Sequence, residues 1–565
     1  MEQVKEKIRI PLTEWQMNAG IIGFLNIMHA AEKSNQIEIL DQEIRFDPEV
    51  LVDFEKDYFN YFIELYKETT SWYKITSYKK KMARFEENDF SSFDEKALEE
   101  LNTYISKVAK YYIKANSYKS VYPLVGNRTP IEALGNELKT TTKLKAKETF
   151  EEKQADILVE VKERFERIKQ IIAYFEDPEV KSHICAKNVL YTVIRNGWDG
   201  VSALNPQTKE KDVYKDFHEF FVAPCFSYVE EDQDKYKFSC ATCNQPIKNL
   251  DNTFSFLVAT GFDTKRKNSH AWDHLNDLAL CPICKLIYAC VPAGFLYVYS
   301  QGIFVNANSS VEELHRIRQK LELEIFRLNN ESLREVNVYA ALIQMLQVEK
   351  NQLVNHEMAD IQVVHFEEER YRFTLLPKRI LRVLSASQNQ LNSLVKTSFK
   401  EGNGQVNLYQ FTVKKLFNSE NLFSFIHKLL LYKATNVQGL YYGVQHINQI
   451  IQINQEFLGG ITAMDKLSQK ELEKIKGAGW HFKQGYENSR KVDGIVYKLL
   501  NALKINNRDG FMDILLNCYS YLGKQVPKWF IKMFKDDETF KTIGYSFVAG
   551  IIGEEKTTAK EGENK

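Results

Sequence analysis

The chain has few of the residues that build fibrous, secreted or uniformly charged proteins. Proline occurs 12 times and glycine 25 times among 565 residues, which excludes collagen-like and low-complexity chains. Eight cysteines are too few for a secreted scaffold held together by disulfides. Lysine plus arginine number 75, as do aspartate plus glutamate, so a uniformly basic, histone-like binder is also excluded, although local basic patches are not.

Long hydrophobic runs are scarce as well. No apolar segment follows the charged start of the chain, so no secretory signal is predicted. Leu278–Tyr299 has Lys285 as its single charge, but it contains Pro282, Pro292 and Gly294, which suit a membrane helix poorly. We therefore expect a cytoplasmic protein with no membrane partner.

The common catalytic signatures are missing from the sequence. It contains no Gly-x-x-x-x-Gly-Lys-Ser/Thr loop, no Gly-x-Ser-x-Gly elbow and no His-Glu-x-x-His motif, which are typical of nucleotide-binding proteins, hydrolases and metalloproteases. Its 11 histidines are scattered. No catalytic residue is predicted, and we expect the protein not to be an enzyme.

Helical periodicity dominates what is present. Phe54, Tyr58, Phe62 and Tyr66 recur at four-residue steps, which is typical of an amphipathic helix. We predict a mainly α, multidomain (α+β) protein with a small β-containing zinc-ribbon insert and a C-terminal helical bundle. The expected parts are a mostly helical, DNA-recognising region (1–215), a zinc-ribbon-like domain with an insert (216–305), a helical region with a β-hairpin (306–455), the bundle (456–553) and a disordered tail (554–565).

Three local features are predicted in more detail. A hairpin is expected over 295–305 with its turn near Gln301 and Gly302. Two strands are expected at Ile361–Phe366 and Tyr371–Leu375. In the bundle, Asp509 is expected to cap a helix that Gly523 ends.

The most specific motif is a pair of Cys-x-x-Cys sequences, Cys240–Cys243 and Cys281–Cys284, separated by 37 residues. Two such knuckles present four thiolates to one tetrahedral ion, usually Zn²⁺. A site with four protein ligands has no open position for water, so the metal is predicted to be structural. Cys225 and Cys290 also lie near in sequence, but each lacks a partner at knuckle spacing.

A nuclease is the main alternative. His270 and His274 lie between the two knuckles, as do the core residues of some HNH nucleases. That motif also needs a final His on a following helix, and none follows Cys284 closely. A zinc-ribbon scaffold that binds only protein is the third possibility.

Local basic patches suggest contacts with phosphates. Residues 457–535 carry 14 Lys or Arg against 7 Asp or Glu. Each patch taken alone is also typical of a solvated surface. The candidate nucleic-acid-binding residues are Lys114, Asn116 and Lys119 beside aromatics, Lys265, Arg266, Lys267 and Asn268 in the zinc-ribbon insert, and Arg490, Lys491 and Lys498 near the C-terminus.

Three separated segments carry a family resemblance. They are WQMNAGIIGFLNI (15–27), then NSHAWD (268–273) with CPICKLIYACVPAGF (281–295), and finally NRDGFMDILLNCYSYLGKQVP (507–527) with GYSFVAGIIG (544–553). With the double knuckle, they make the chain similar to the large subunit of type I-B CRISPR interference complexes, which are Cascade-type surveillance assemblies. None of these segments is a catalytic motif.

The resemblance implies a role in antiviral defence without catalysis. Such a subunit sits beside the handle-binding and backbone subunits of a guide-RNA complex and reads a short motif flanking the target in duplex DNA. It helps to open that duplex, holds the displaced strand and offers a docking surface for a helicase-nuclease. Its C-terminal helical part resembles the separate small subunit of other systems. Guide pairing supplies most of the sequence specificity in such complexes, so a nearly neutral protein suffices.

Overall fold

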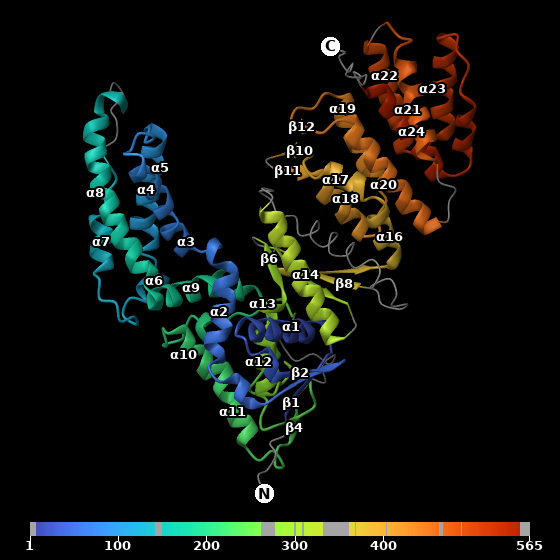
Figure 1. The fold of residues 1–565 in the computed structure, drawn as a ribbon. Coiled ribbons are helices and arrows are strands. Elements are labelled where there is room, and N and C mark those ends of the chain that lie inside the picture. Colours follow the sequence, from blue (N-terminus) through green and yellow to red (C-terminus); the bar gives the residue numbers. More distant parts are fainter. Residues whose placement is uncertain are drawn as a thin grey trace, which may run out of the picture. The chain divides into compact units, whose positions relative to one another are not determined.

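The computed structural model describes residues 7–141, 150–260, 277–298, 301–307, 310–330, 361–367, 369–402, 404–462, 467–487 and 489–553 (Figure 1). The chain divides into two compact units. Unit 1 comprises Met1–Gln319 and Val364–Arg372, and unit 2 comprises Lys320–Val363 and Phe373–Lys565. Helices predominate and the sheets have two to four strands, which confirms the predicted fold class. The finer division into five ranges stays a prediction.

The centre of unit 1 is a helix with almost no exposed face. In α1 (Trp15–Ala30) every residue from Gln16 to Met28 is buried, because the segment is apolar all round and only a protein interior accommodates such a helix. Its polar residues are paired. Asn18 Nδ2 donates to Asn306 Oδ1 at 3.2 Å, and Asn26 Nδ2 donates to the Ala293 carbonyl at 3.0 Å.

Glycines allow two short helices to pack directly on α1. These are α12 (Pro282–Ala289) and α13 (Val291–Gly294). A Cβ atom at Gly23 would lie 2.0 Å from the Cys290 carbonyl oxygen, and one at Gly294 would lie 2.0 Å from the Ala19 carbonyl oxygen. The first two resemblance segments therefore form one packed contact, which requires small residues on both sides.

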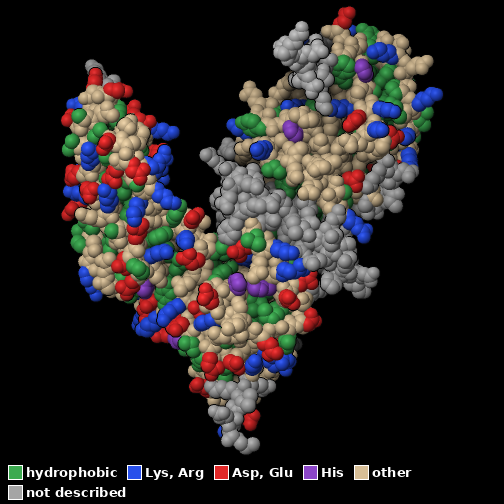
Figure 2. Space-filling model, in the orientation of Figure 1, with side chains coloured by type: hydrophobic (Ala, Val, Ile, Leu, Met, Phe, Trp, Pro, Cys, Tyr) green, Lys and Arg blue, Asp and Glu red, His purple; other side chains and the backbone are tan. Residues whose placement is uncertain are grey.

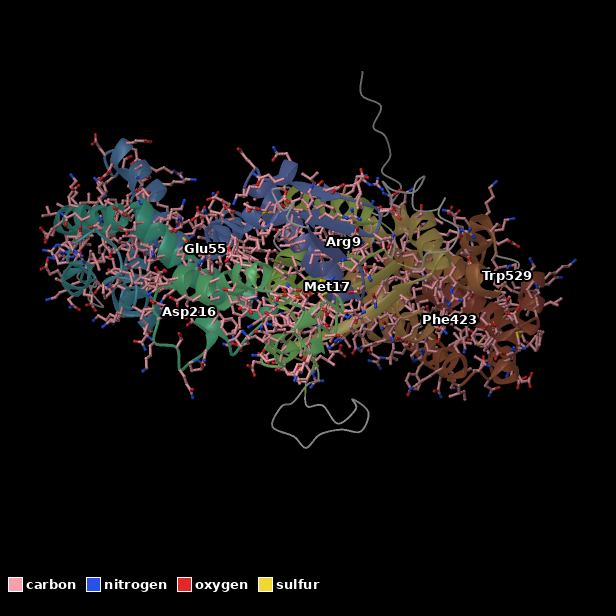
Figure 3. The ribbon with its side chains drawn as sticks, turned by 90° about the horizontal axis from the view of Figure 1, so that it is seen from below. Arg9, Met17, Glu55, Asp216, Phe423 and Trp529 are labelled. Carbon is pink, nitrogen blue, oxygen red and sulfur yellow. The ribbon has the colours of Figure 1, made fainter. Side chains whose placement is uncertain are left out.

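Other elements surround this contact. The predicted helix over residues 54–66 is α2, and its aromatic stripe is buried. Two small sheets have the strand orders β1-β3-β2 and β6-β7-β8-β9. Their strands are β1 (Ile8–Pro11), β2 (Ile37–Ile39), β3 (Glu43–Phe46), β6 (Leu296–Val298), β7 (Gln301–Asn306), β8 (Ile361–Glu367) and β9 (Arg370–Leu376). The remaining central helices are α9 (Pro178–Thr192), α10 (Val213–Phe217), α11 (Ala223–Glu230) and the first part of α14 (Val311–Asn330), whose residues from Lys320 on belong to unit 2. Figure 3 marks Met17 on α1, Glu55 on α2 and Asp216 on α10.

Unit 1 also contains a helical lobe with an apolar core of its own. Ile75, Leu101, Val161, Phe165 and Ile168 are among the fully buried residues of this core. Its helices are α3 (Ser71–Thr76), α4 (Tyr78–Glu87), α5 (Glu95–Lys107), α6 (Asn116–Lys119), α7 (Ile131–Glu137) and α8 (Phe150–Glu176). Side chains of both charge signs are mixed over the face of the lobe drawn in Figure 2.

Where the structure describes it, unit 2 is mainly helical and contains a three-stranded sheet in the order β11-β10-β12. Within it, α21 (Gln469–Lys483) and α24 (Asp537–Ile552) approach closely because Gly479 and Gly550 lie between them. Phe423, labelled in Figure 3, stacks on Tyr545 of α24 with ring centroids 6.0 Å apart. The elements are α16 (Lys378–Ala386), α17 (Gln388–Leu394), α18 (Leu408–Phe417), α19 (Phe423–Ala434), α20 (Val444–Thr462), α21 (Gln469–Lys483), α22 (Ser489–Lys504), α23 (Arg508–Tyr521), α24 (Asp537–Ile552), β10 (Ser398–Glu401), β11 (Gly404–Asn407) and β12 (Leu440–Tyr441).

One local prediction was wrong, and another was right except for its turn residues. Asn507, not Asp509, caps α23: its side-chain oxygen accepts a hydrogen bond from the Gly510 amide at 2.8 Å. Asn at this position satisfies a free amide without charge, and Asp509 falls in the first turn. The predicted hairpin is confirmed, since β6 pairs with β7 in the antiparallel direction, but Gln301 pairs with Val298, so Gln301 and Gly302 belong to the second strand and not to the turn. The predicted helix end at Gly523 is confirmed by its left-handed backbone, with φ of +63°.

No helix in the described part of the chain is both long enough and apolar enough to cross a membrane. Leu278–Tyr299 instead supplies α12, α13 and β6, as its prolines and glycine predicted.

Candidate metal centre and nucleic-acid interface

The two cysteine knuckles are held by different local structures. Cys240 and Cys243 lie in the turn between β4 (Phe238–Ser239) and β5 (Pro246–Ile247). The Cys240 amide donates to the Gln245 carbonyl at 2.8 Å to close that turn. The second knuckle opens α12: Cys281 is the N-cap, and its sulfur accepts a hydrogen bond from the Cys284 amide at 3.3 Å.

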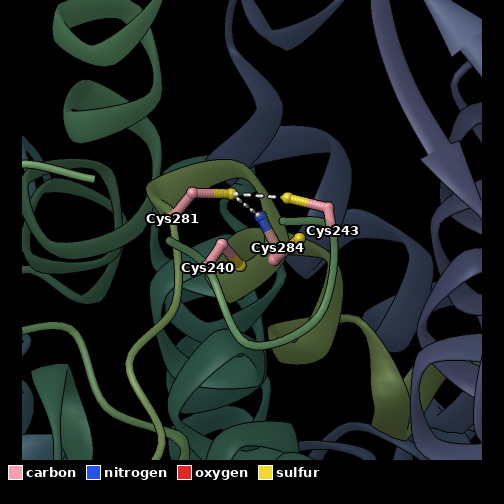
Figure 4. A group of neighbouring side chains, drawn as sticks. All are labelled: Cys240, Cys243, Cys281 and Cys284. Carbon is pink, nitrogen blue, oxygen red and sulfur yellow. Dashed lines mark hydrogen bonds between the residues drawn. The ribbon is translucent and has the colours of Figure 1, made fainter. Parts of the chain in front are cut away.

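The fold brings the four sulfurs together (Figure 4). All four Sγ atoms lie within 4.8 Å of one another, and those of Cys243 and Cys281 are 3.7 Å apart. A tetrahedral Zn²⁺ with bonds of about 2.3 Å would place its sulfur ligands about 3.8 Å apart. The thiols are unbridged, and Cys240, Cys281 and Cys284 are buried. The cluster thus fits one metal ion held by four thiolates.

The electrostatics of the cluster favour a cation. Hydrogen bonds from the other three thiols, with that of Cys243 foremost, lower the pKa of Cys240. The pKa values of Cys281 and Cys284 are raised, first of all because each hydrogen-bonds to Cys240. Four thiolates this close repel one another strongly, so all four ionise together only around a positive ion.

The two neighbouring cysteines lie outside the cluster. Cys225 donates its thiol hydrogen to the Phe221 carbonyl at 3.2 Å, and Cys290 donates to the Leu286 carbonyl at 3.3 Å. Burial raises the pKa of both thiols. They are neutral packing residues, and the doubled knuckle alone provides the four converging sulfurs.

A short hydrogen-bond chain connects the first knuckle to α1. The hydroxyls of Thr242 and Tyr288 are 3.0 Å apart, and the Tyr288 hydroxyl donates to Glu14 Oε1 at 2.9 Å. Glu14 caps α1 by accepting from the amides of Gln16 and Met17. Burial raises the pKa of this carboxyl group. The cysteine cluster therefore supports the start of the central helix as well as its own loops.

A comparison with known protein families matched the segment that contains the cysteine cluster. Residues 233–296 match a family model described as CRISPR-associated protein (Cas_CXXC_CXXC). The cysteine region is similar to CRISPR-associated proteins. This segment contains all four clustered cysteines, and it supports a CRISPR-associated role for the chain. No curated protein and no solved structure gives a significant match.

The first predicted nucleic-acid cluster is solvent-exposed. Lys114 and Asn116 are exposed, and Asn116 begins α6. Lys119 is also exposed, but it is engaged in an ion pair with Glu132 at 3.0 Å. Such a pair is worth little at a surface and yields readily to a phosphate. The cluster is accessible to a ligand, with part of its charge already balanced.

The loop candidates fall outside the described residues. They are Lys265, Arg266, Lys267 and Asn268, together with His270 and His274 of the nuclease alternative.

The C-terminal candidates lie on α22 beside a stack of aromatic rings. Arg490, Lys491 and Lys498 are exposed. Lys491 Nζ lies 5.5 Å from the centre of the Tyr521 ring. Tyr521, 68% exposed, stacks on Tyr486 at 5.6 Å with an interplanar angle of 13°. Cations over exposed aromatic rings are the usual elements of single-strand recognition.

Neither Tyr486 nor Tyr521 was predicted from the sequence as a functional residue. Tyr521 follows the buried positions Leu515 and Tyr519 of α23 but lies off their stripe. Because of this offset, the sequence could have predicted that the Tyr521 side chain is exposed. Tyr486 lies between α21 and α22, and no periodicity identifies its partner.

Proposed function

We propose that the chain is the non-catalytic large subunit of a type I-B CRISPR interference complex, and that its cysteine cluster holds a structural Zn²⁺. The observation that carries this proposal is the convergence of four sulfurs within a segment similar to CRISPR-associated proteins. The three-segment resemblance supplies the finer assignment to type I-B and to the large subunit.

In this function the metal contributes stability, and DNA recognition belongs to surface residues. The four thiolates would occupy every coordination position of the ion, so it activates no water. The chain works in the cytoplasm with guide RNA and with the handle-binding, backbone and small subunits. It reads the flanking motif in duplex DNA, helps to open the duplex, holds the displaced strand and recruits a helicase-nuclease. Guide pairing supplies the remaining sequence specificity.

The surface formed by Lys491, Lys498, Tyr521 and Tyr486 supports the part of the proposal that concerns the displaced strand. An unpaired strand exposes base faces, which stack on aromatic rings, and phosphates, which attract lysines. In a closed duplex the base faces are stacked inside and are not available to such rings. We therefore assign this surface, named here the α22–α23 surface, to single-stranded DNA.

Reversing two charges on the α22–α23 surface tests this assignment. We expect Lys491→Glu with Lys498→Glu to weaken retention of an opened target by roughly tenfold or more at low salt, because two phosphate contacts become repulsive. The loss should shrink as salt rises. Fluorescence anisotropy of a labelled target across a salt series measures both effects.

The matched control is Lys470→Glu with Lys474→Glu, two exposed lysines on α21. This pair changes the net charge by the same amount away from the aromatic stack. If the two double variants lose affinity equally, the charge acts only through the general field and the assigned surface is wrong.

A further inference from the structure

A basic groove in the helical lobe is lined by residues other than the candidate nucleic-acid-binding residues. It has a volume of about 500 Å³ and lies between α3–α4 on one side and α5 on the other. Lys74 and Lys81 line the first side, and Lys96 and Lys107 line the second. All four lysines are exposed. A concave site of this size suits a ligand segment of drug-like size.

The groove carries more positive charge than its own acids balance. Its four lysines face two acidic residues, Glu99 and Glu100. Lys81 forms an ion pair with Glu100 at 2.9 Å, which lowers the pKa of that carboxyl group. In the part of the chain that the structure describes, no carboxylate lies within ion-pair distance of Lys74, Lys96 or Lys107. Three ammonium groups are therefore available to an anion.

Aromatic rings form the floor and one end of the groove. Tyr78 and Tyr104 stack with ring centroids 4.1 Å apart and an interplanar angle of 13°. The Tyr104 hydroxyl donates to the Ile75 carbonyl at 2.8 Å, which fixes the pair. Burial raises the pKa of both phenols, so they stay neutral and add no repulsion toward a phosphate. The floor is aromatic and uncharged.

A π-helical turn shapes the end of the groove. After α5 the chain continues as the π-helix η4 (Val108–Tyr112), which the Ile113 amide closes by donating to the Val108 carbonyl at 3.1 Å. The wider turn brings Tyr112 to the groove wall and leaves Tyr111 68% exposed. Isolated π turns are uncommon and are frequent at functional sites.

We infer that this groove binds the sugar-phosphate backbone of a single-stranded polynucleotide, with Tyr112 against a base or sugar. In a double helix the bases are stacked on one another, so Tyr112 could stack on a base only in a single strand. A single chain can pass between two rows of lysines and neutralise both. The inference rests on the proposed function, since it supplies a second contact for an unpaired strand in unit 1.

The test is binding of a labelled single-stranded oligothymidylate by the full chain carrying Lys96→Gln and Lys107→Gln. The logarithm of the binding constant falls linearly with the logarithm of the salt concentration, and each lost phosphate contact makes this slope shallower by about 0.7. Two lost contacts therefore change the slope by about 1.4, which corresponds to about 25-fold weaker binding at 0.1 M salt. Glu100→Gln should tighten binding, because it frees Lys81. The matched control, Lys209→Gln with Lys235→Gln, removes two exposed lysines elsewhere in unit 1 and should leave the slope unchanged.

Photocrosslinking locates the strand independently of affinity. An oligonucleotide containing 5-iododeoxyuridine should crosslink to Tyr112 or Tyr111 in the unaltered chain, and much less in the Lys96→Gln, Lys107→Gln variant. If the groove variant and the control variant lose equal amounts of affinity and of crosslinking, the inference is wrong. Equal weakening of single-stranded and duplex DNA would overturn the assignment to a single strand.

The two proposals can fail separately. The proposed function would be contradicted, and the groove site supported, if the chain joins no guide-RNA complex but its binding of single strands is lost when Lys96 and Lys107 are replaced. A chain that assembles with guide RNA but binds single strands equally well without these lysines would remove only the groove.

Discussion

Replacement of Cys284 by serine is expected to release the metal and to unfold the region around α12. The ion binds only the folded arrangement of four sulfurs, so its binding free energy stabilises that fold. In small peptides the binding of a structural zinc ion contributes roughly 10–16 kcal/mol to the free energy of folding. Losing even a third of that free energy, about 3–5 kcal/mol, is a large change compared with the total stability of a typical domain. Metal analysis should fall from about one ion per chain toward none, with a lower unfolding temperature.

Cys290→Ser is the matched control for this change. Cys290 is buried at the end of the same helix and lies outside the cluster. Its thiol hydrogen bonds to the Leu286 carbonyl, and a serine hydroxyl can do the same. This variant should keep about one ion per chain. Equal metal content in the Cys284 variant and the unaltered protein would contradict the four-thiolate site.

The second large effect is expected from one added methyl group in unit 2. A Cβ atom at Gly479 would lie 2.1 Å from the Phe547 carbonyl oxygen, and Gly550 across the contact has an equally close neighbour in Lys476. Backbone atoms cannot rotate away, so α21 and α24 must separate. We expect Gly479→Ala to lower the free energy of unfolding of the bundle by about 1–3 kcal/mol or more.

Gly477→Ala, two residues before Gly479 on the same helix, is expected to stabilise the bundle. A Cβ atom at Gly477 would meet no atom within 4 Å, so alanine supplies only its better helix propensity. We expect a gain of about 0.5–1 kcal/mol. Hydrogen exchange of α21 and α24 amides in the full chain measures both variants locally. Equal effects at the two positions would contradict the close approach of α21 and α24.

Regular patterns in the sequence predicted much of the fold. The four-residue spacing of aromatics from Phe54 to Tyr66 gave α2 and its buried face, because helical periodicity depends on neighbouring residues alone. The two strands β8 and β9 were also predicted from their own local sequence. The doubled Cys-x-x-Cys motif likewise predicted a four-sulfur cluster, because two-residue spacing places both sulfurs of a knuckle on one side of a turn.

Features that depend on distant residues were not predicted. The glycine contact between α1 and α13 joins segments more than 260 residues apart, and no local pattern indicates which glycines meet. The stack of Tyr486 on Tyr521 depends in the same way on how α23 packs. The cap at Asn507 was missed for another reason, since Asn507 and Asp509 are both good capping residues and the backbone chooses between them.

The central claim is most directly tested by capture of a target by the complex assembled with this chain. The chain is purified with its neighbouring subunits and guide RNA, and target duplexes are offered that match the guide but differ only in the flanking sequence. The account predicts that guide RNA copurifies, that one flanking motif binds much more tightly than scrambled flanks, and that DNA stays uncut until a helicase-nuclease is added. A chain that carries no guide RNA, or that captures all flanks equally well, would contradict it.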